Sequence, residues 1–166
     1  MSEHSKSGTV EFYRERHAFE TPLTLQVLRG VPADKLGYKP HPQSSSAEAI
    51  LWTVVKGLIT RNEVAAMGEA DITAGPPQSY TTMLAQFEGL SAALAVKLDH
   101  LSQAGWEQTT RLRAGRQIVM ETSVGELLWL FHFDLIHHRG QLTTYLRPMG
   151  SKVPSIYGKS ADTTAG

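Results

Sequence analysis

The sequence contains no cysteine, and this absence is the first constraint on what the protein can do. It excludes a disulfide framework, a cysteine-ligated zinc site, an iron–sulfur cluster and a cysteine nucleophile. Any metal ion must therefore be bound by histidine, aspartate or glutamate, and any thiol chemistry requires a thiol from a small molecule. The 7 histidines are accordingly the first residues to examine.

The sequence also lacks an excess of charge and any long hydrophobic run. The 16 Lys and Arg residues balance the 16 Asp and Glu residues, whereas binding to a nucleic-acid backbone requires a basic domain or stripe. The best apolar segment, 50–59, contains Lys56 and is shorter than the roughly 18 residues that cross a bilayer. Residues 1–8 are polar and lack the apolar region of a signal peptide. We therefore expect a soluble, cytoplasmic protein that binds neither nucleic acid nor a membrane.

What the sequence does contain is enough apolar material for one core. Its 166 residues, 41% of them hydrophobic, predict a single domain over residues 1–166, with an irregular tail from about residue 151. Hydrophobic periodicity predicts four helices, over about 10–29, 45–68, 80–103 and 123–147. Pro22 interrupts the first, so we expect a kink there or a restart capped by Thr21.

Local signals define the ends of the elements. Ser45 with Glu48, and Ser123 with Glu126, have the spacing of capping boxes at the starts of the second and fourth helices. Residues 69–79 contain a Gly-Pro-Pro run and are expected to form a loop. Between 106 and 122, alternation around Leu112 and a following turn predict a small two-stranded hairpin. The expected fold is all-α, a four-helix bundle with a small β-hairpin between helices 3 and 4.

The fourth helix carries a histidine cluster. Asp134 and His138 are four residues apart, so their side chains share one face, whereas His132 points to a different face. Two interpretations are open at this point. The pair is a satisfied hydrogen-bonded pair at the edge of the bundle, or it supplies two ligands of a divalent-metal site that opens into the bundle.

The segment around this cluster resembles the C-terminal end of DinB-like proteins, of the DinB/YfiT superfamily. The matching motifs are His137-His138-Arg139-Gly140-Gln141-Leu142, Tyr145-Leu146-Arg147 and the tail Val153-Pro154-Ser155-Ile156-Tyr157-Gly158-Lys159-Ser160-Ala161-Asp162. The loop Tyr38-Lys39-Pro40-His41 also matches, so the resemblance covers most of the chain. It implies a bundle with helices in a down-up-up-down arrangement and a homodimeric assembly.

The resemblance also implies a function. Family members carry a three-histidine site for a divalent metal, with one ligand on the second helix and two on the last helix. Characterised relatives include thiol S-transferases that use bacillithiol-like thiols and a mycothiol-dependent isomerase. The implied cofactors are a divalent ion (Ni, Zn or Mn) and a low-molecular-weight thiol, whose pKa the metal would lower. The implied partner is a small-molecule substrate or ligand.

This sequence departs from the family pattern at two positions. Asp134 replaces the first histidine of the last-helix pair, and Thr53 occupies the second-helix position after Trp52. Aspartate is an oxygen ligand, but a neutral threonine hydroxyl is a poor one. The resulting set, Thr53, Asp134 and His138, would bind metal weakly, prefer a harder ion such as Mg or Mn, or have lost the metal. His17 and His100 are possible substitutes, although we expect both at the surface.

Two functions follow as hypotheses. The first is a metal-dependent thiol S-transferase-type enzyme with a degenerate metal site. The alternative is a non-catalytic, stress-associated bundle that has lost the metal and binds a small molecule or has a structural role. Several aromatic side chains are expected in the core or around a substrate pocket: Trp52, Trp129, Phe131 and Phe133. Arg139 and Arg147 are candidates for binding an anionic cofactor, with an interaction with the helix dipole as the alternative. Tyr157 either closes over the mouth of the bundle or lies at a dimer contact.

Overall fold

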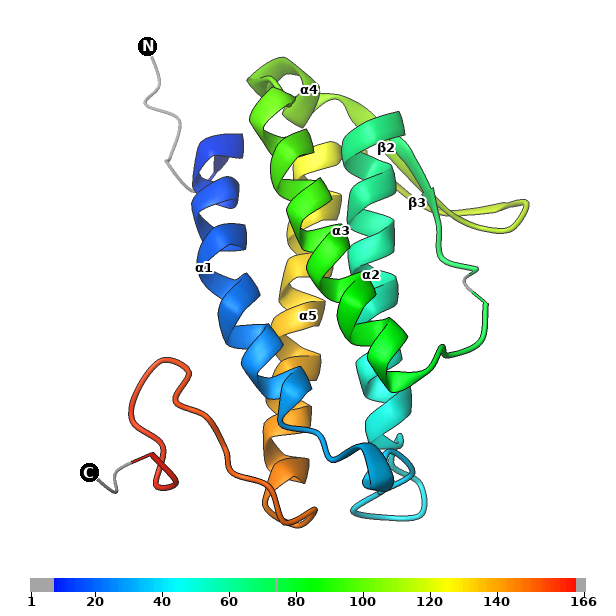
Figure 1. Cartoon of the computed structure of the whole chain (residues 1–166). Helices are drawn as coiled ribbons and strands as arrows, with labels where there is room; N and C mark the ends of the chain where they lie inside the picture. The colour runs from blue at the N-terminus through cyan, green and yellow to red at the C-terminus, as the bar shows by residue number, and fades with distance from the viewer. Residues whose placement is uncertain (1–7, 74, 164–166) are drawn as a thin grey trace.

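The computed structural model describes residues 8–73 and 75–163 (Figure 1). Four long helices form its body: α1 (Val10–Arg29), α2 (Ala47–Met67), α3 (Tyr80–His100) and α5 (Val124–Leu146). Each long helix packs against two others, because α1 and α2 both contact α3 and α5. In Figure 1, α1 and α5 run in one direction while α2 and α3 run in the opposite direction. None of the described helices is both long enough and apolar enough to cross a membrane.

The expected all-α four-helix bundle is wrong, because the structure contains five α-helices and a three-stranded mixed sheet. The fifth helix is the short α4 (Gln103–Glu107), and a 3-10 turn, η2 (Ala33–Lys35), precedes α2. The predicted hairpin forms as β2 (Thr109–Ala114) and β3 (Gln117–Ser123), which pair antiparallel. A third strand, β1 (Glu69–Asp71), pairs parallel to β2 within the segment expected to be a loop.

Long-range packing explains why β1 forms despite its short length. Ala70 lies opposite Leu112 in the β1–β2 register, and both side chains are buried. Arg113 Nε donates to Glu69 Oε2 at 3.0 Å across the same strands. Neither contact is visible in the local sequence, since the partners are more than 40 residues apart. The sheet packs beside α2, and in Figure 1 the hairpin extends past this helix, away from the bundle.

The helix ends follow the predicted capping chemistry, with one displacement. Ser123 and Glu126 form the expected capping box at the start of α5. At α2 the cap is Ser46, which accepts a hydrogen bond from the Ala49 N–H at 3.1 Å, and not Ser45 as predicted. α2 ends at Gly68, whose φ of 74° lies in the left-handed region that glycine adopts without strain.

The first helix is continuous through Pro22, so it does not restart there with Thr21 as a cap. The exposed Pro22 ring lies on the solvent side, while Tyr13, Thr24 and Leu28 bury the opposite side of the helix. The Thr21 hydroxyl donates to the His17 carbonyl at 2.7 Å instead of capping a new helix. Burial of this face against α3 and α5 therefore outweighs the loss of one backbone hydrogen bond at proline.

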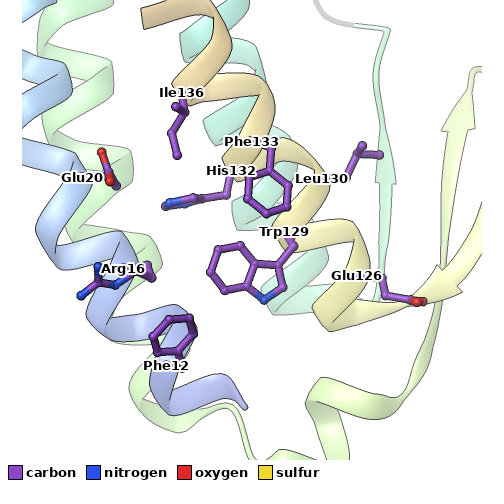
Figure 2. A pocket seen from close by; sticks show the side chains of 9 residues that line it. All are labelled: Phe12, Arg16, Glu20, Glu126, Trp129, Leu130, His132, Phe133 and Ile136. Carbon is purple, nitrogen blue, oxygen red and sulfur yellow. The ribbon is translucent and has the colours of Figure 1, made fainter. Parts of the chain in front are cut away.

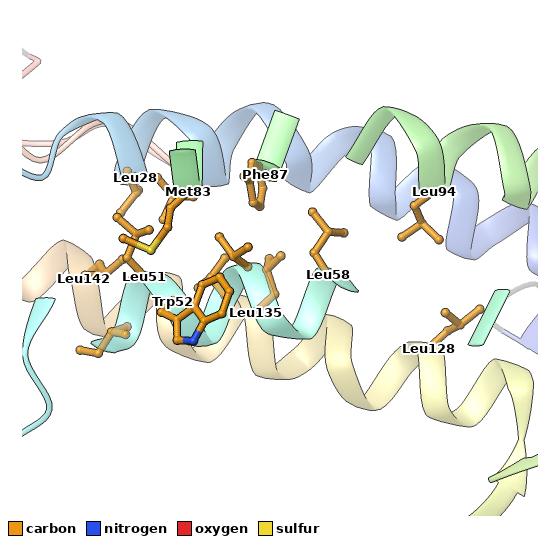
Figure 3. Close-up of a cluster of buried hydrophobic side chains, with 14 of the residues drawn as sticks. Leu28, Leu51, Trp52, Leu58, Met83, Phe87, Leu94, Leu128, Leu135 and Leu142 are labelled. Carbon is orange, nitrogen blue, oxygen red and sulfur yellow. The ribbon is translucent and has the colours of Figure 1, made fainter. Parts of the chain in front are cut away.

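The core lies on the inward faces of the four long helices (Figure 3). Leucines dominate it, with Leu58 from α2, Leu94 from α3 and Leu128 from α5 almost completely buried. At one end, Gly125 in the first turn of α5 lies directly under the indole of Trp106 from α4. A Cβ at position 125 would fall 2.2 Å from Trp106 Cε2, so only glycine permits this contact. The core thus fixes α5, which carries most of the candidate site residues.

Candidate functional site

The predicted pair on α5 does come together. Asp134 Oδ1 lies 3.3 Å from His138 Nε2, and the other ring nitrogen of His138, Nδ1, lies 2.7 Å from Gln141 Oε1. Both ring nitrogens of His138 therefore have a partner within the same helix. The neighbouring His137 is exposed and contacts the His138 ring edge-on.

Thr53 faces the same region from α2. It lines a cavity of about 290 Å³ together with Asp134 and Phe131 of α5, and the cavity is closed by residues of α2 and the sheet: Lys56, Gly57, Ile59, Thr60, Asp71, Ile72 and Leu112. The Thr53 hydroxyl donates to the Ala49 carbonyl of its own helix at 2.9 Å. Gly57, one turn along α2, also lies near Asp134, since a Cβ there would be 4.0 Å from Asp134 Oδ2.

These residues do not make the three-ligand metal site that the resemblance implies. Asp134 and His138 provide two strong donors, but the third position offers only the neutral hydroxyl of Thr53. Within residues 8–73 and 75–163, no cluster of three or more histidine, aspartate or glutamate side chains could hold a metal ion. The donor set therefore does not fit the family centre, and we derive no chemistry from a metal at this position.

The substitute histidines do not complete the site either. His100, the last residue of α3, is exposed. His17 is buried, contrary to the expected surface position, because it shares the inward face of α1 with Tyr13 and Glu20. Its Nε2 lies 3.0 Å from the Ser91 carbonyl of α3. Burial, followed by the charge of Arg61, lowers the pKa of His17 to about 4.

A second histidine, His132, is buried at the centre of a polar cluster. Arg61 Nη1 from α2 lies 3.3 Å from its Nδ1. Since a guanidinium only donates hydrogen bonds, Nδ1 must be the acceptor, and the proton of the neutral ring is on Nε2. Burial, followed by the charge of Arg61, lowers the pKa of His132 to about 3, so the ring is neutral at physiological pH. Its edge packs against the rings of Tyr13 and Trp129.

A groove of about 660 Å³ runs between α1 and α5, next to this cluster (Figure 2). The residues that line it are Phe12, Arg16, Glu20, Glu126, Trp129, Leu130, His132, Phe133 and Ile136. Trp129 stacks on Phe133 with ring centroids 5.4 Å apart, and Phe12 lies 6.0 Å from Trp129. Phe133 is 60% exposed, so the aromatic wall is open to solvent.

The four aromatic side chains that the sequence suggested for the core or a substrate pocket lie in three different places. Trp129 and Phe133 line the groove, whereas Phe131 faces the smaller cavity beside Asp134. Trp52 is buried in the core, and its indole donates to the Gly75 carbonyl at 3.0 Å.

Arg139 and the tail close one end of the α1–α5 interface. The buried Arg139 donates to Glu20 of α1 and, at 2.5 Å, to the Tyr157 hydroxyl. Tyr157 in turn donates to Glu20 at 2.8 Å, and its ring stacks on Phe19. The tail therefore closes over α1 and α5 within the same chain. Arg147 pairs with Asp162 of the tail at 2.9 Å, so both arginines have carboxylate partners inside the protein.

Arg61 is the residue that the sequence analysis missed. It is the largest fully buried side chain of the described residues, at 1% exposure. A usable signal was present, because Arg61 follows Leu58 by three residues and Val54 by seven on the apolar face of α2. A charged residue on the apolar face of a helix is predicted to be buried, with its polar group inside the core.

Comparison with known proteins agrees with the resemblance. The model of the DinB family matches residues 1–165. A solved DinB-like protein from Bacillus subtilis (YjoA) is 18% identical, with a TM-score of 0.69 over 89% of this chain and 98% of that one. A DinB-like protein from Bacillus cereus ATCC 10987 is 19% identical, with a TM-score of 0.71 over 90% and 98%. No curated protein matches the sequence. The fold and the match along nearly the whole sequence together show that this chain belongs to the DinB family.

Proposed function

We propose that this DinB-family protein binds a small organic molecule in the α1–α5 groove and does so without a three-ligand metal centre. The observation that carries the proposal is an aromatic groove with a buried histidine N–H, that of His132, at its floor. Small-molecule sites typically have volumes of about 300–1,000 Å³, mostly apolar walls and a few placed polar groups. The groove, at about 660 Å³, meets each of these criteria.

In this proposal the Asp134–His138 pair is structural. His138 bridges Asp134 and Gln141, and Thr53 is hydrogen-bonded to its own helix, so each residue of the expected ligand set already has a partner within the protein. The side chains of Asp134 and His138 are 39% and 21% exposed, which indicates a surface hydrogen bond of modest strength.

The proposal is tested with a neutral fluorescent probe of aromatic sites, N-phenyl-1-naphthylamine. We expect saturable binding to one site per chain and lost binding in Leu130→Asp, since Leu130 lines the groove. Val96→Asp is the matched control, because Val96 is also an exposed aliphatic residue on a long helix, α3, and lies outside the groove. The absence of saturable binding, or equal loss in both variants, would contradict the proposal.

A weak divalent-metal site is the second candidate, favoured by one distance. The separation of 3.3 Å between Asp134 Oδ1 and His138 Nε2 is close to that of two ligand atoms on one ion with bonds of about 2.1 Å. Thiol S-transferase activity would require such a site together with a small-molecule thiol, because the chain has no cysteine.

Calorimetric titration of tag-free protein with Zn²⁺, Ni²⁺ and Mn²⁺ separates the two candidates. His138→Ala is the test variant, and His137→Ala is its control, since His137 is the exposed neighbour on the same helix. We expect neither stoichiometric binding nor a difference between the variants. Tight binding at one ion per chain that disappears only in His138→Ala would favour the metal-dependent function.

A further inference from the structure

The centre of the molecule contains a buried positive charge, and no carboxylate of residues 8–73 or 75–163 forms an ion pair with it. Arg61 is almost fully buried, and its Nη1 contacts the Nδ1 of His132. The Tyr13 hydroxyl lies near the Arg61 guanidinium, whose charge acts against the burial that raises the pKa of Tyr13. The Nε of Arg61 has no hydrogen-bond partner among the described residues. A buried, uncompensated cation is costly, so an anion placed near it would stabilise the protein.

His132 connects this charge to the groove. Its Nδ1 accepts from Arg61, so its Nε2 carries a proton, and the described residues supply no acceptor for that N–H. Figure 2 shows the ring extending from α5 towards α1, between Ile136 and Trp129, into the groove. A hydrogen bond on one side of a ring strengthens the donor on the other side. The groove therefore ends at a polarised donor on a side chain that is 1% exposed.

Arg16 provides a second positive group on the α1 side. Its guanidinium lies over the rings of Phe12 and Phe19, at 5.4 and 5.2 Å from their centroids. Its Nε is buried and has no hydrogen-bond partner among the described residues. The charges of Arg61, Arg139 and Arg16 all lower the pKa of His132, which indicates a positive potential at the groove floor.

The two carboxylates that line the groove are engaged elsewhere. Glu20 pairs with Arg139 and accepts from Tyr157. Glu126, at the opposite end, accepts from Thr122 and Ser123 in the cap of α5. The free polar groups of the groove are therefore donors, and its walls are aromatic rings.

We infer that the groove binds a planar aromatic carboxylate, whose carboxylate accepts from His132 Nε2–H beside Arg16 and whose ring lies against Trp129 and Phe133. The inference rests on the proposed function and specifies its ligand class. Such a ligand places its negative charge where the protein has an unpaired positive one, and it matches the flat aromatic wall.

Three probes of the same shape and different charge test the ligand class: 2-naphthoate, the neutral 2-naphthamide and the cationic 2-naphthylmethylamine. Their dissociation constants are measured by calorimetry at pH 7.5 with the full, tag-free chain. We expect 2-naphthoate to bind about tenfold more tightly than 2-naphthamide, because a charged acceptor forms the stronger hydrogen bond. We expect the cationic probe to bind most weakly.

Two substitutions at His132 separate the donor from the contact with Arg61. In His132→Asn the amide oxygen can occupy the position of Nδ1 and accept from Arg61, but the N–H directed into the groove is lost. In His132→Gln an amide can reach the position of Nε2. We expect His132→Asn to abolish the preference for 2-naphthoate and His132→Gln to retain part of it.

Arg16 allows the same test without altering the core, since this side chain is partly exposed. We expect Arg16→Gln to raise the dissociation constant of 2-naphthoate about tenfold and to leave that of 2-naphthamide unchanged. Arg14→Gln is the control, because Arg14 interacts with Asp99 and the Leu98 carbonyl at the α3 side.

The possible results have distinct meanings. Equal affinity for 2-naphthoate and 2-naphthamide, or preference for the cation, would overturn the ligand class and leave the binding groove in place. If no probe binds and sedimentation shows a dimer that Leu130→Asp dissociates, the groove is an interface between two copies, and the proposed function fails as well.

Discussion

The two sides of α5 carry histidines in opposite situations. On the side facing α2, His138 is partly exposed, and both of its ring nitrogens have partners, Asp134 and Gln141. On the side facing α1, His132 is buried and is held at one nitrogen by the cation Arg61, while its other nitrogen points into a groove. His138 has the spacing of a known motif, whereas the second ring nitrogen of His132 has no hydrogen bond to another described residue. The proposed function therefore rests on hydrogen-bonding capacity left free at the groove and not on motif spacing.

The largest difference between the two sides should appear when a carboxylate is removed. Glu20→Gln leaves Arg139 buried without its counter-charge, since these side chains are only 8% and 3% exposed. We expect the free energy of unfolding to fall by about 3–5 kcal/mol, measured by urea denaturation at pH 7.5. Glu88→Gln is the control, because the Glu88–Arg29 pair is exposed. A loss below about 1 kcal/mol for Glu20→Gln would show that the α1 side is less tightly coupled than its burial indicates.

The buried histidines should make stability depend on pH. His17 and His132 have pKa values lowered to about 4 and about 3, whereas unfolded histidine has a pKa of about 6.5. Below pH 6.5 the unfolded chain therefore binds protons that the folded chain does not, so stability falls as the pH falls. We expect a loss of about 2.5 kcal/mol between pH 7.5 and 5.5 for the two histidines together.

This pH window excludes the carboxylates with lowered pKa values, because their contribution is lost only at lower pH. The double variant His17→Asn/His132→Asn should remove most of the dependence between pH 7.5 and 5.5, and each single variant about half of it. An unchanged dependence in the double variant would mean that other groups cause it.

A smaller effect is expected at the tail. Tyr157→Phe removes the hydroxyl that joins Glu20 and Arg139, while the ring can still stack on Phe19. We expect a loss of about 1 kcal/mol in the free energy of unfolding and faster proteolysis of the tail. Tyr38→Phe serves as the control, because the Tyr38 ring packs edge-on against Tyr145 at the opposite end of α2 from the sheet. Equal proteolysis of wild type and Tyr157→Phe would show that the hydroxyl does not hold the tail.

The smallest effect is expected on the α2 side. Asp134→Asn retains the size of the side chain and weakens only a partly exposed contact with His138, so the loss of stability should be below about 1 kcal/mol. Urea denaturation at pH 7.5 measures it. A loss of about 3 kcal/mol or more would mean that the Asp134–His138 pair stabilises the fold as much as we expect of Glu20–Arg139. The two sides of α5 would then not differ.

The sequence predicted the elements whose signals are local. Ser123 and Glu126 lie within one helical turn, and the hairpin around Leu112 depends on neighbouring residues, so both could be located. β1 could not, because three residues become a strand only when β2, some 40 positions away, pairs with them. The restart considered at Pro22 does not occur for a related reason, since packing against distant helices decides whether α1 continues.

The candidate site was only partly predictable. The spacing of Asp134 and His138 correctly brought the two together, but spacing could not reveal that Gln141 holds the second nitrogen of His138. The groove depends on which face of α1 meets α5, and on the pairing of Arg61 with His132 across 71 positions. His17 was expected at the surface because a single histidine on an amphipathic helix gives no indication of its own burial.

The glycine at the start of α5 links a distant part of the chain to the groove floor. Trp106 lies against Gly125 on one side and against the ring of Tyr13 on the other, and Tyr13 touches both Trp129 and His132. A single added methyl group at position 125 would displace the Trp106 indole. Tyr13, which packs against it, would then have to move, and its contacts with Trp129 and His132 would change. In a saturation scan of probe binding, position 125 should therefore behave like a residue of the α1–α5 groove, although Gly125 does not line that groove.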